Sequence, residues 1–207
     1  MVAFQASLFD AAPEIAVLPL DPARIQLTDG AWVDVQRRWI LGADALFERL
    51  RDSVAWRAER RPMYDRVVDV PRLLAFYAED DLLPDPALER AKALLDACYE
   101  PELGEPFVTA GLCLYRDGRD SVAWHGDRIG RGNTEDTMVA IVSLGAPRLL
   151  TLRPRGGGRR TLRFEVGHGD LLVMGGSCQR TWEHAVPKTA KPVGPRISVQ
   201  FRVTGVR

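Results

Sequence analysis

His125 and Asp127 have the residue types and the spacing that metal chemistry requires. They stand two residues apart in the run Val-Ala-Trp-His-Gly-Asp, and residues i and i+2 of a β-strand point to the same face. Their imidazole nitrogen and carboxylate oxygen can therefore reach one metal ion. His184, 59 residues further along the chain, is the candidate third ligand. Two histidines and one carboxylate form a facial triad, which suits iron(II) and leaves positions open for other ligands.

A second His-Gly-Asp run, from His168 to Asp170, competes for the role of metal site. Glycine on both sides of His168 is typical of a tight turn, and the Leu-Leu-Val-Met run after Asp170 is typical of a strand. We therefore expect His168 to be a turn residue rather than a ligand. The alternative for His125 and His184 is that both are ordinary polar surface residues.

The last expected strand alternates polar and apolar residues with a period of two. One of its faces carries Arg196, Ser198, Gln200 and Arg202, and the other face is apolar. The usual interpretation is a polar face in solvent and an apolar face in the core. Two arginines that flank hydroxyl and amide groups also suit a carboxylate ligand, because a guanidinium can bind a carboxylate through two parallel hydrogen bonds.

These motifs together resemble the AlkB family of iron(II)/2-oxoglutarate dioxygenases, and in particular the branch that repairs alkylated bases. The resemblance covers about residues 40 to 203. It includes Tyr-x-Asp-Gly-x-Asp from Tyr115, Gly-Asp-Leu-Leu-Val-Met-x-Gly from Gly169, Gln-x-x-Trp-x-His-x-Val-Pro-Lys from Gln179, and Val-Pro-Arg ending at Arg72.

The resemblance implies that the two histidines and the aspartate named above bind iron(II), and that 2-oxoglutarate is the cosubstrate. It implies that Arg196 pairs with the far carboxylate of 2-oxoglutarate, that Tyr115 donates a hydrogen bond beside it, and that Arg202 lies near the metal-bound end. Trp182 is expected to pack rather than to take part in chemistry. The implied reaction is oxidative dealkylation of bases in DNA or RNA, which consumes O2 and releases succinate, CO2 and formaldehyde.

Two positions depart from the family's pattern. Cys113 stands where members commonly carry an asparagine that contacts 2-oxoglutarate, and a thiol is a poor replacement for an amide. Ile129 stands where members that repair bases often have an acidic residue. Two other function classes therefore stay open: an oxygenase of the same fold that acts on a protein side chain or a small molecule, and a binding protein without activity.

Two segments are candidates for substrate binding. Residues 57–82 mix basic and aromatic residues in a pattern that we interpret as irregular, and AlkB-like proteins place here the lid that covers a flipped nucleotide. Arg72 and Tyr77 are its candidate contacts, and an ordinary surface loop is the alternative. The second segment is an acid-free run of six arginines at positions 148, 153, 155, 159, 160 and 163. We expect Arg159 and Arg160 to contact phosphates, with a solvated face as the alternative.

The composition is that of one soluble globular domain. The chain has 207 residues, 46% of them hydrophobic and 27% charged, and its 28 basic and 28 acidic residues cancel. A nucleic-acid partner would therefore have to bind local patches. Three cysteines without paired spacing indicate a reducing compartment, and we find neither a signal peptide nor an apolar run long enough to span a bilayer. We expect a cytoplasmic monomer without membrane contact.

The periodicity predicts a mainly β fold. Eight strands are expected from residue 107 onward, at 107–115, 121–127, 137–144, 148–153, 161–166, 171–174, 181–186 and 196–203, and they fit a double-sheet jelly roll (double-stranded β-helix, cupin-like). Residues 107–207 would form this oxygenase core. Residues 21–106 would form helical support and lid, with short strands over 21–41, a helix capped by Asp44, and a second helix over 86–99. We expect both helices to pack on one sheet.

Residues 1–20 are expected to form a flexible arm. Within it, the run from Gln5 to Phe9 resembles the short peptide with which bacterial replication and repair proteins bind the sliding clamp. Leu8 and Phe9 could insert into a pocket of such a partner, while Gln5 forms hydrogen bonds. The alternative is that Leu8 and Phe9 fold back onto the core of this protein.

Overall fold

The eight strands expected from residue 107 onward are all present in the computed structural model, which describes residues 14–63, 66–157 and 161–206. They are β7 (Thr109–Tyr115), β8 (Val122–His125), β9 (Val139–Gly145), β10 (Arg148–Pro154), β11 (Leu162–Val166), β12 (Asp170–Gly176), β13 (Trp182–Val186) and β14 (Arg196–Arg202). The earlier strands are β1 (Ala16–Val17), β2 (Ala23–Gln26), β3 (Ala31–Gln36), β4 (Ile40–Leu41), β5 (Arg57–Met63) and β6 (Arg66–Tyr77).

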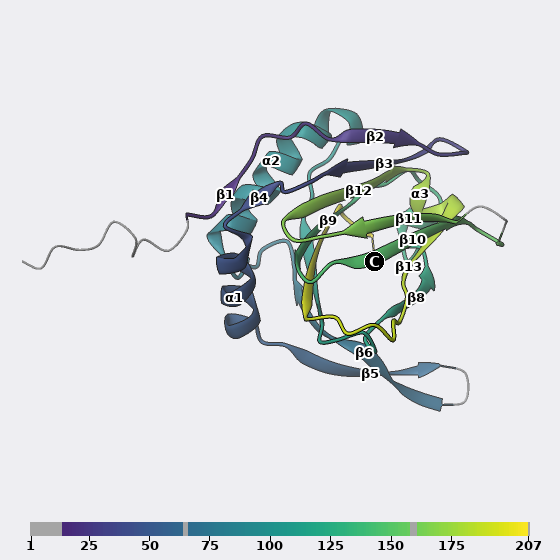
Figure 1. Ribbon diagram of the computed structural model, residues 1–207. Helices are drawn as coiled ribbons and strands as arrows, with labels where there is room; N and C mark the ends of the chain where they lie inside the picture. The colour runs from purple at the N-terminus through teal and green to yellow at the C-terminus, as the bar shows by residue number, and fades with distance from the viewer. Residues whose placement is uncertain (1–13, 64–65, 158–160, 207) are drawn as a thin grey trace, which may run out of the picture.

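The strands form two sheets that face each other, and a short β1–β4 pair stands apart from them (Figure 1). The large sheet has the order β2-β3-β12-β9-β14-β7-β6-β5, and the small sheet has the order β11-β10-β13-β8. This arrangement confirms the predicted jelly roll. Strands that precede residue 107 pair directly with core strands at both ends of the large sheet, through β3 with β12 and through β6 with β7.

Residues 57–82 differ from the sequence prediction, because most of them are regular strand rather than irregular. β5 and β6 form a hairpin that projects from the sandwich (Figure 1). Their register shifts between Ala58 and Arg60, where residues 70–72 of β6 bulge. Pro71 lies in this bulge, a position where the missing backbone N–H of proline is tolerated. Proline is rare inside strands, so Pro71 made the sequence of this segment look irregular.

The two longer helices are α1 (Ala43–Ser53) and α2 (Pro86–Leu103), and the described residues also form the short helices η1 (Arg131–Asn133) and α3 (Cys178–Thr181). The prediction of Asp44 as the N-cap of α1 is wrong. Gly42 caps the helix in a left-handed conformation with φ of 64°, and an added Cβ there would lie 2.8 Å from the carbonyl oxygen of Glu14. Asp85 caps α2, since its carboxylate accepts a hydrogen bond from the N–H of Ala87.

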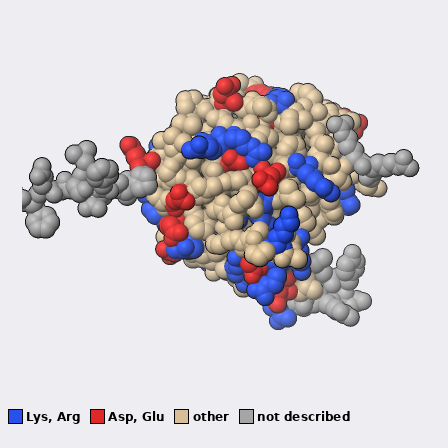
Figure 2. Space-filling model, viewed as in Figure 1, with Lys and Arg blue, Asp and Glu red and all other residues tan. Residues whose placement is uncertain are grey.

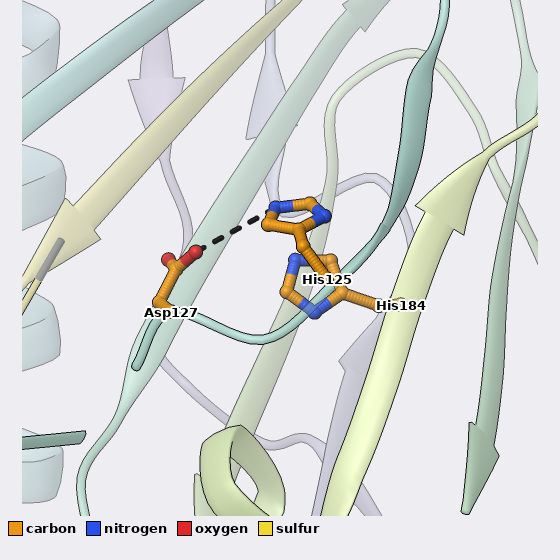
Figure 3. A group of neighbouring side chains, drawn as sticks. All are labelled: His125, Asp127 and His184. Atoms are coloured by element: carbon orange, nitrogen blue, oxygen red, sulfur yellow. Dashed lines mark ion pairs between the residues drawn. The ribbon is translucent and has the colours of Figure 1, made fainter. Parts of the chain in front are cut away.

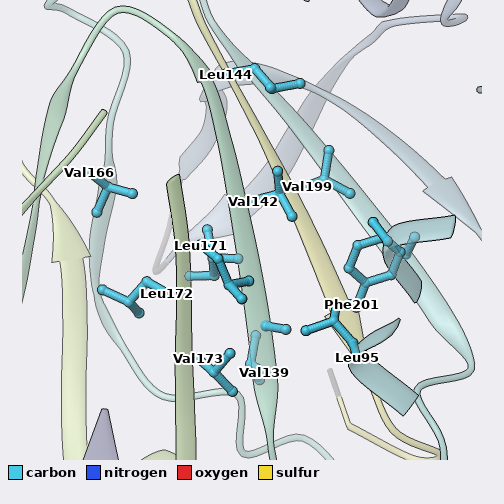
Figure 4. Packing of buried hydrophobic residues seen from close by; sticks show 14 of the residues in the cluster. Leu95, Val139, Val142, Leu144, Val166, Leu171, Leu172, Val173, Val199 and Phe201 are labelled. Carbon is cyan, nitrogen blue, oxygen red and sulfur yellow. The ribbon is translucent and has the colours of Figure 1, made fainter. Parts of the chain in front are cut away.

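The two faces of β14 differ in character. On β14, Val199 and Phe201 are fully buried, and Figure 4 shows Phe201 beside Leu95 of α2. Alternate residues of β14 point into the space between the sheets, and among them Arg196 and Ser198 are each only 2% exposed. The usual interpretation of this strand, with its polar face in solvent, is therefore wrong. The hydrophobic cluster fills the layer between the large sheet and the helices and also includes residues that face the space between the sheets, such as Ile141 and Leu152.

Charged side chains of both signs are intermixed on the face of the molecule shown in Figure 2. Among the described residues, no helix is long and apolar enough to cross a membrane. The run from Gln5 to Phe9 lies outside the described residues, as do Arg159 and Arg160.

The packing of α2 on the large sheet leads us to expect different stabilities for alanine variants of two leucines. Leu95 is fully buried, whereas Leu82 is 87% exposed. We expect Leu95→Ala to lower the free energy of unfolding by about 2–5 kcal/mol, because it removes buried methyl groups and leaves a cavity. Leu82→Ala should change it by less than about 0.5 kcal/mol. Urea denaturation of both variants measures the difference, and equal losses would contradict this packing.

Candidate metal and cosubstrate site

His125, Asp127 and His184 meet in the space between the sheets (Figure 3). His125 of β8 and His184 of β13 are directly paired across the small sheet, and their ring centroids are 4.2 Å apart. Asp127 follows two residues after the end of β8, with Oδ1 3.6 Å from Nε2 of His125. Each of the three side chains offers one ligand atom, and these atoms all lie within 4.8 Å of one another. The three predicted ligands are thus brought together in a group that could bind a metal ion.

The position of Asp127 depends on close backbone contacts. A Cβ at Gly126 would lie 2.3 Å from the carbonyl oxygen of Gln179, and a Cβ at Gly132 would lie 2.1 Å from that of Asp127. The residue between His125 and Asp127 is therefore glycine for steric reasons. The side chain of Gln179 accepts a hydrogen bond of 2.9 Å from the N–H of Asp127. The sequence analysis gave Gln179 no role, although Gln179 opens the Gln-x-x-Trp-x-His run that carries part of the family resemblance.

The electrostatics keep Asp127 and His184 in the forms that bind metal. Burial disfavours the charge of Asp127, but Arg202, His184 and His125 outweigh it and lower the pKa of Asp127 to about 2. Burial, with His125 and Arg202 adding to it, lowers the pKa of His184 to about 3 against the attraction of Asp127. At neutral pH the site therefore holds a carboxylate and a neutral imidazole. Nδ1 of His125 donates a hydrogen bond of 2.8 Å to the carbonyl oxygen of Ala123. The other ring nitrogen, Nε2, is therefore the atom that can bind a metal ion.

Arg202 holds the carboxylate of Asp127 from the opposite sheet. Its Nε donates a hydrogen bond of 2.7 Å to Oδ2 of Asp127. Glycine at position 111 makes room for this guanidinium, since a Cβ there would lie 2.9 Å from Nη1 of Arg202. The thiol of Cys113 donates a hydrogen bond to Oε1 of Gln200, two residues before Arg202, with 3.7 Å between sulfur and oxygen. The structure thus places Cys113 and Arg202 on the same inner face of the large sheet.

Arg196 lies buried at the other end of this face. Its Nε donates a hydrogen bond of 2.8 Å to Oγ of Ser143, and its guanidinium carbon lies 5.3 Å from the centroid of the Tyr115 ring. Nη1 of Arg196 is buried and has no hydrogen-bond partner among the described residues. A buried guanidinium N–H without an acceptor is unfavourable, and a carboxylate would satisfy it. This arrangement fits a dicarboxylate such as 2-oxoglutarate, as the donor set of His125, Asp127 and His184 fits iron(II).

Arg72 and Tyr77, the predicted lid residues, lie on different faces of the large sheet. The guanidinium of Arg72 interacts with the side chains of Cys113 and Tyr115, on the inner face. Tyr77 pairs with Ala110 and packs on the core on the helix side, so the structure does not bring it toward the metal group. Phe76, which is 58% exposed, is the aromatic residue of β6 on the inner face.

The run of six arginines is not a continuous patch of free charges. Arg148 is only 4% exposed and donates to the carbonyl oxygens of Asp117, Asp120 and Pro187. Arg153 pairs with Glu183 at 2.9 Å, and its guanidinium lies 4.2 Å from the centroid of the Trp124 ring. The sequence could not show these partners, because the carbonyls and Glu183 come from other parts of the chain.

His168 lies in a turn, as predicted, and is not part of the metal-binding group. Its Nδ1 accepts a hydrogen bond of 2.7 Å from the N–H of Gly145, and its Nε2 lies 3.1 Å from Oδ1 of Asp44. The hydrogen bond at Nδ1 therefore joins this turn to the end of β9.

A family model described as the 2OG-Fe(II) oxygenase superfamily matches residues 77–202. The chain is 31% identical to the alpha-ketoglutarate-dependent dioxygenase AlkB homolog 3 of Bos taurus, over 91% of this chain and 69% of that protein. It is 34% identical to the DNA oxidative demethylase ALKBH2 of Arabidopsis thaliana, over 61% of this chain and 45% of that protein. A prolyl hydroxylase structure from Trichoplax adhaerens, solved with a hypoxia inducible factor peptide, aligns with a TM-score of 0.62 at 12% identity, covering 86% of this chain and 84% of that one, and shows the fold alone. The chain therefore belongs to the 2OG-Fe(II) oxygenase superfamily as an AlkB-like dioxygenase, which uses iron(II) and 2-oxoglutarate.

Proposed function

We propose that this protein removes alkyl groups oxidatively from nucleic-acid bases, with iron(II) bound by His125, Asp127 and His184. The observation that carries the proposal is that the space between the two sheets holds both this group and a guanidinium N–H of Arg196 that has no partner among the described residues. The similarity to AlkB homolog 3 and to a DNA oxidative demethylase supports the choice of nucleic acid as substrate.

The residues of the chain bind and orient the reactants. Arg196 pairs with the far carboxylate of 2-oxoglutarate, and Tyr115 stands beside it with its hydroxyl protonated, because burial raises its pKa to about 12. Arg202 keeps the Asp127 carboxylate ionised and fixed in place. Bound iron(II) would supply the hydroxylation of a C–H bond by O2, coupled to the decarboxylation of 2-oxoglutarate to succinate and CO2. A hydroxylated methyl group would then leave the base nitrogen as formaldehyde.

If the three residues bind the metal ion, replacing His125 and replacing His168 should have different effects on metal binding. His125→Ala and Asp127→Ala should abolish Mn(II) binding in calorimetry and succinate formation with iron(II), because each removes a ligand atom. His168→Ala is the matched control and should retain both, since His168 only braces a turn. Metal binding that survives in His125→Ala but is lost in folded His168→Ala would contradict this assignment.

The substrate class is tested by product release and by salt dependence. A methylated oligonucleotide should yield formaldehyde, whereas the undamaged oligonucleotide should not. Binding of the methylated oligonucleotide should weaken with salt, and replacing Arg159 and Arg160 by serine should reduce the slope by about one to two phosphate equivalents. Arg51→Ser, which changes an exposed arginine of α1 paired with Glu48, is the control. An affinity indifferent to salt, without formaldehyde release, would favour a protein side chain or a small molecule as substrate.

The run from Gln5 to Phe9 supports a further part of the proposal, recruitment by a bacterial sliding clamp. Two adjacent large apolar residues on a polar arm can insert into a pocket of a partner. A purified clamp should retain the wild-type protein and release the Leu8→Ala/Phe9→Ala variant, while turnover of free oligonucleotide stays unchanged. Equal retention of both proteins, or of neither, would remove this partner.

A further inference from the structure

Arg72, Tyr115 and Arg196 form a row across three neighbouring strands of the large sheet. Arg196 of β14 pairs directly with Tyr115 of β7. Arg72 of β6 lies one step beyond the pair of Leu73 and Leu114, which places it next to Tyr115. Tyr115 and Arg196 are directly paired and point to the same inner face, and the guanidinium of Arg72 interacts there with the side chains of Tyr115 and Cys113. The row therefore brings two guanidinium groups to the two sides of one phenol.

The guanidinium of Arg72 has an N–H group that no described residue accepts. Its Nη1 donates a hydrogen bond of 3.1 Å to the carbonyl oxygen of Ser121. Its Nε is buried and has no hydrogen-bond partner among the described residues. Burial disfavours the charge of Arg72, but the neighbouring side chains of Cys113 and Tyr115 outweigh it and leave its pKa above the ordinary value. Arg72 thus stays a cation beside Cys113, the position that lacks the amide common in the family.

Arg148, a third arginine near Tyr115, differs from Arg72 and Arg196 because its hydrogen bonds go to the backbone. Arg148 lies 5.6 Å from the centroid of the Tyr115 ring, yet it donates to three backbone carbonyls and so serves the framework. Arg72 and Arg196 each retain a buried N–H without an acceptor. Two such groups in one region are unfavourable unless an anion accepts from both.

We propose that Arg72 binds the carboxylate of the cosubstrate together with Arg196, in place of the amide that Cys113 cannot provide. The ligand class is a 2-oxo dicarboxylate, and the second guanidinium compensates for the missing amide hydrogen bond. This inference rests on the cosubstrate role of Arg196 and Tyr115 proposed above, and it moves Arg72 from the predicted nucleotide lid to the cosubstrate pocket.

A purely structural role for Arg72 is the competing explanation. The hydrogen bond from Arg72 to the carbonyl oxygen of Ser121 joins β6 to the segment before β8. It would explain why the position is an arginine if no other bond joined these two segments. The N–H of Ser121 already donates to the carbonyl oxygen of Pro71 at 2.9 Å, so the backbone makes the connection on its own. The experiment must still separate the two roles.

Binding of two acids to the Mn(II)-loaded protein separates them in calorimetry. 2-Oxoglutarate carries the far carboxylate, and 2-oxopentanoate has a methyl group in its place. Arg72→Leu should weaken 2-oxoglutarate binding by about 10–100-fold, the range for a charge-assisted hydrogen bond, and should change 2-oxopentanoate binding by less than about twofold. Arg72→Lys should recover part of the loss. Arg57→Leu, at an exposed arginine of β5, is the matched control and should bind both acids normally.

Three results would overturn the inference. Equal weakening of both acids in Arg72→Leu would show a structural role. Unchanged 2-oxoglutarate binding with weaker binding of the methylated oligonucleotide would return Arg72 to the substrate side, and unchanged binding of both ligands would leave it without either role. Arg196→Leu is measured in parallel. If it leaves 2-oxoglutarate binding intact, the proposed cosubstrate site itself fails; if it weakens binding and Arg72→Leu does not, only the inference about Arg72 fails.

Discussion

β14 turns its apolar face to the helices and its polar face to the space between the sheets, and the site depends on this arrangement. Apolar residues of β14 such as Val199 and Phe201 pack toward α2, so the inner face of the same strand is free to be polar. A polar interior is stable only when its groups have partners. Ser143 accepts from Arg196, and Asp127 accepts from Arg202, so most of this interior is satisfied by the chain itself.

Attraction between Arg202 and Asp127 links the two sheets at the metal-binding group. Asp127 is almost fully buried, and a buried carboxylate would take up a proton without a nearby cation. Arg202 on the large sheet provides that cation, while His184 on the small sheet stays neutral. A charged ligand and a neutral ligand are thus present before a metal ion binds.

Arginine takes very different roles in the same small region. Arg148 and Arg196 are both buried beside Tyr115, but only Arg196 keeps an N–H without a partner. Arg153, expected in a phosphate-binding patch, is neutralised by Glu183. Backbone carbonyls and acidic side chains from distant segments decide which guanidinium is left to bind a ligand. A count of arginines along the chain does not distinguish these cases.

The eight core strands and the metal-binding group were predicted from the sequence alone. Period-two alternation is a local property, so it predicted all eight core strands, the common face of Arg196 and Arg202, and the pairing of His125 with Asp127. Tertiary structure decided the rest. It turned the polar face of β14 inward, made a strand of the segment around Pro71, directed Phe76 rather than Tyr77 to the inner face, and set Arg72 beside Cys113. Alternation defines two faces of a strand, but only packing against elements from elsewhere in the chain determines which face is covered and which charges meet.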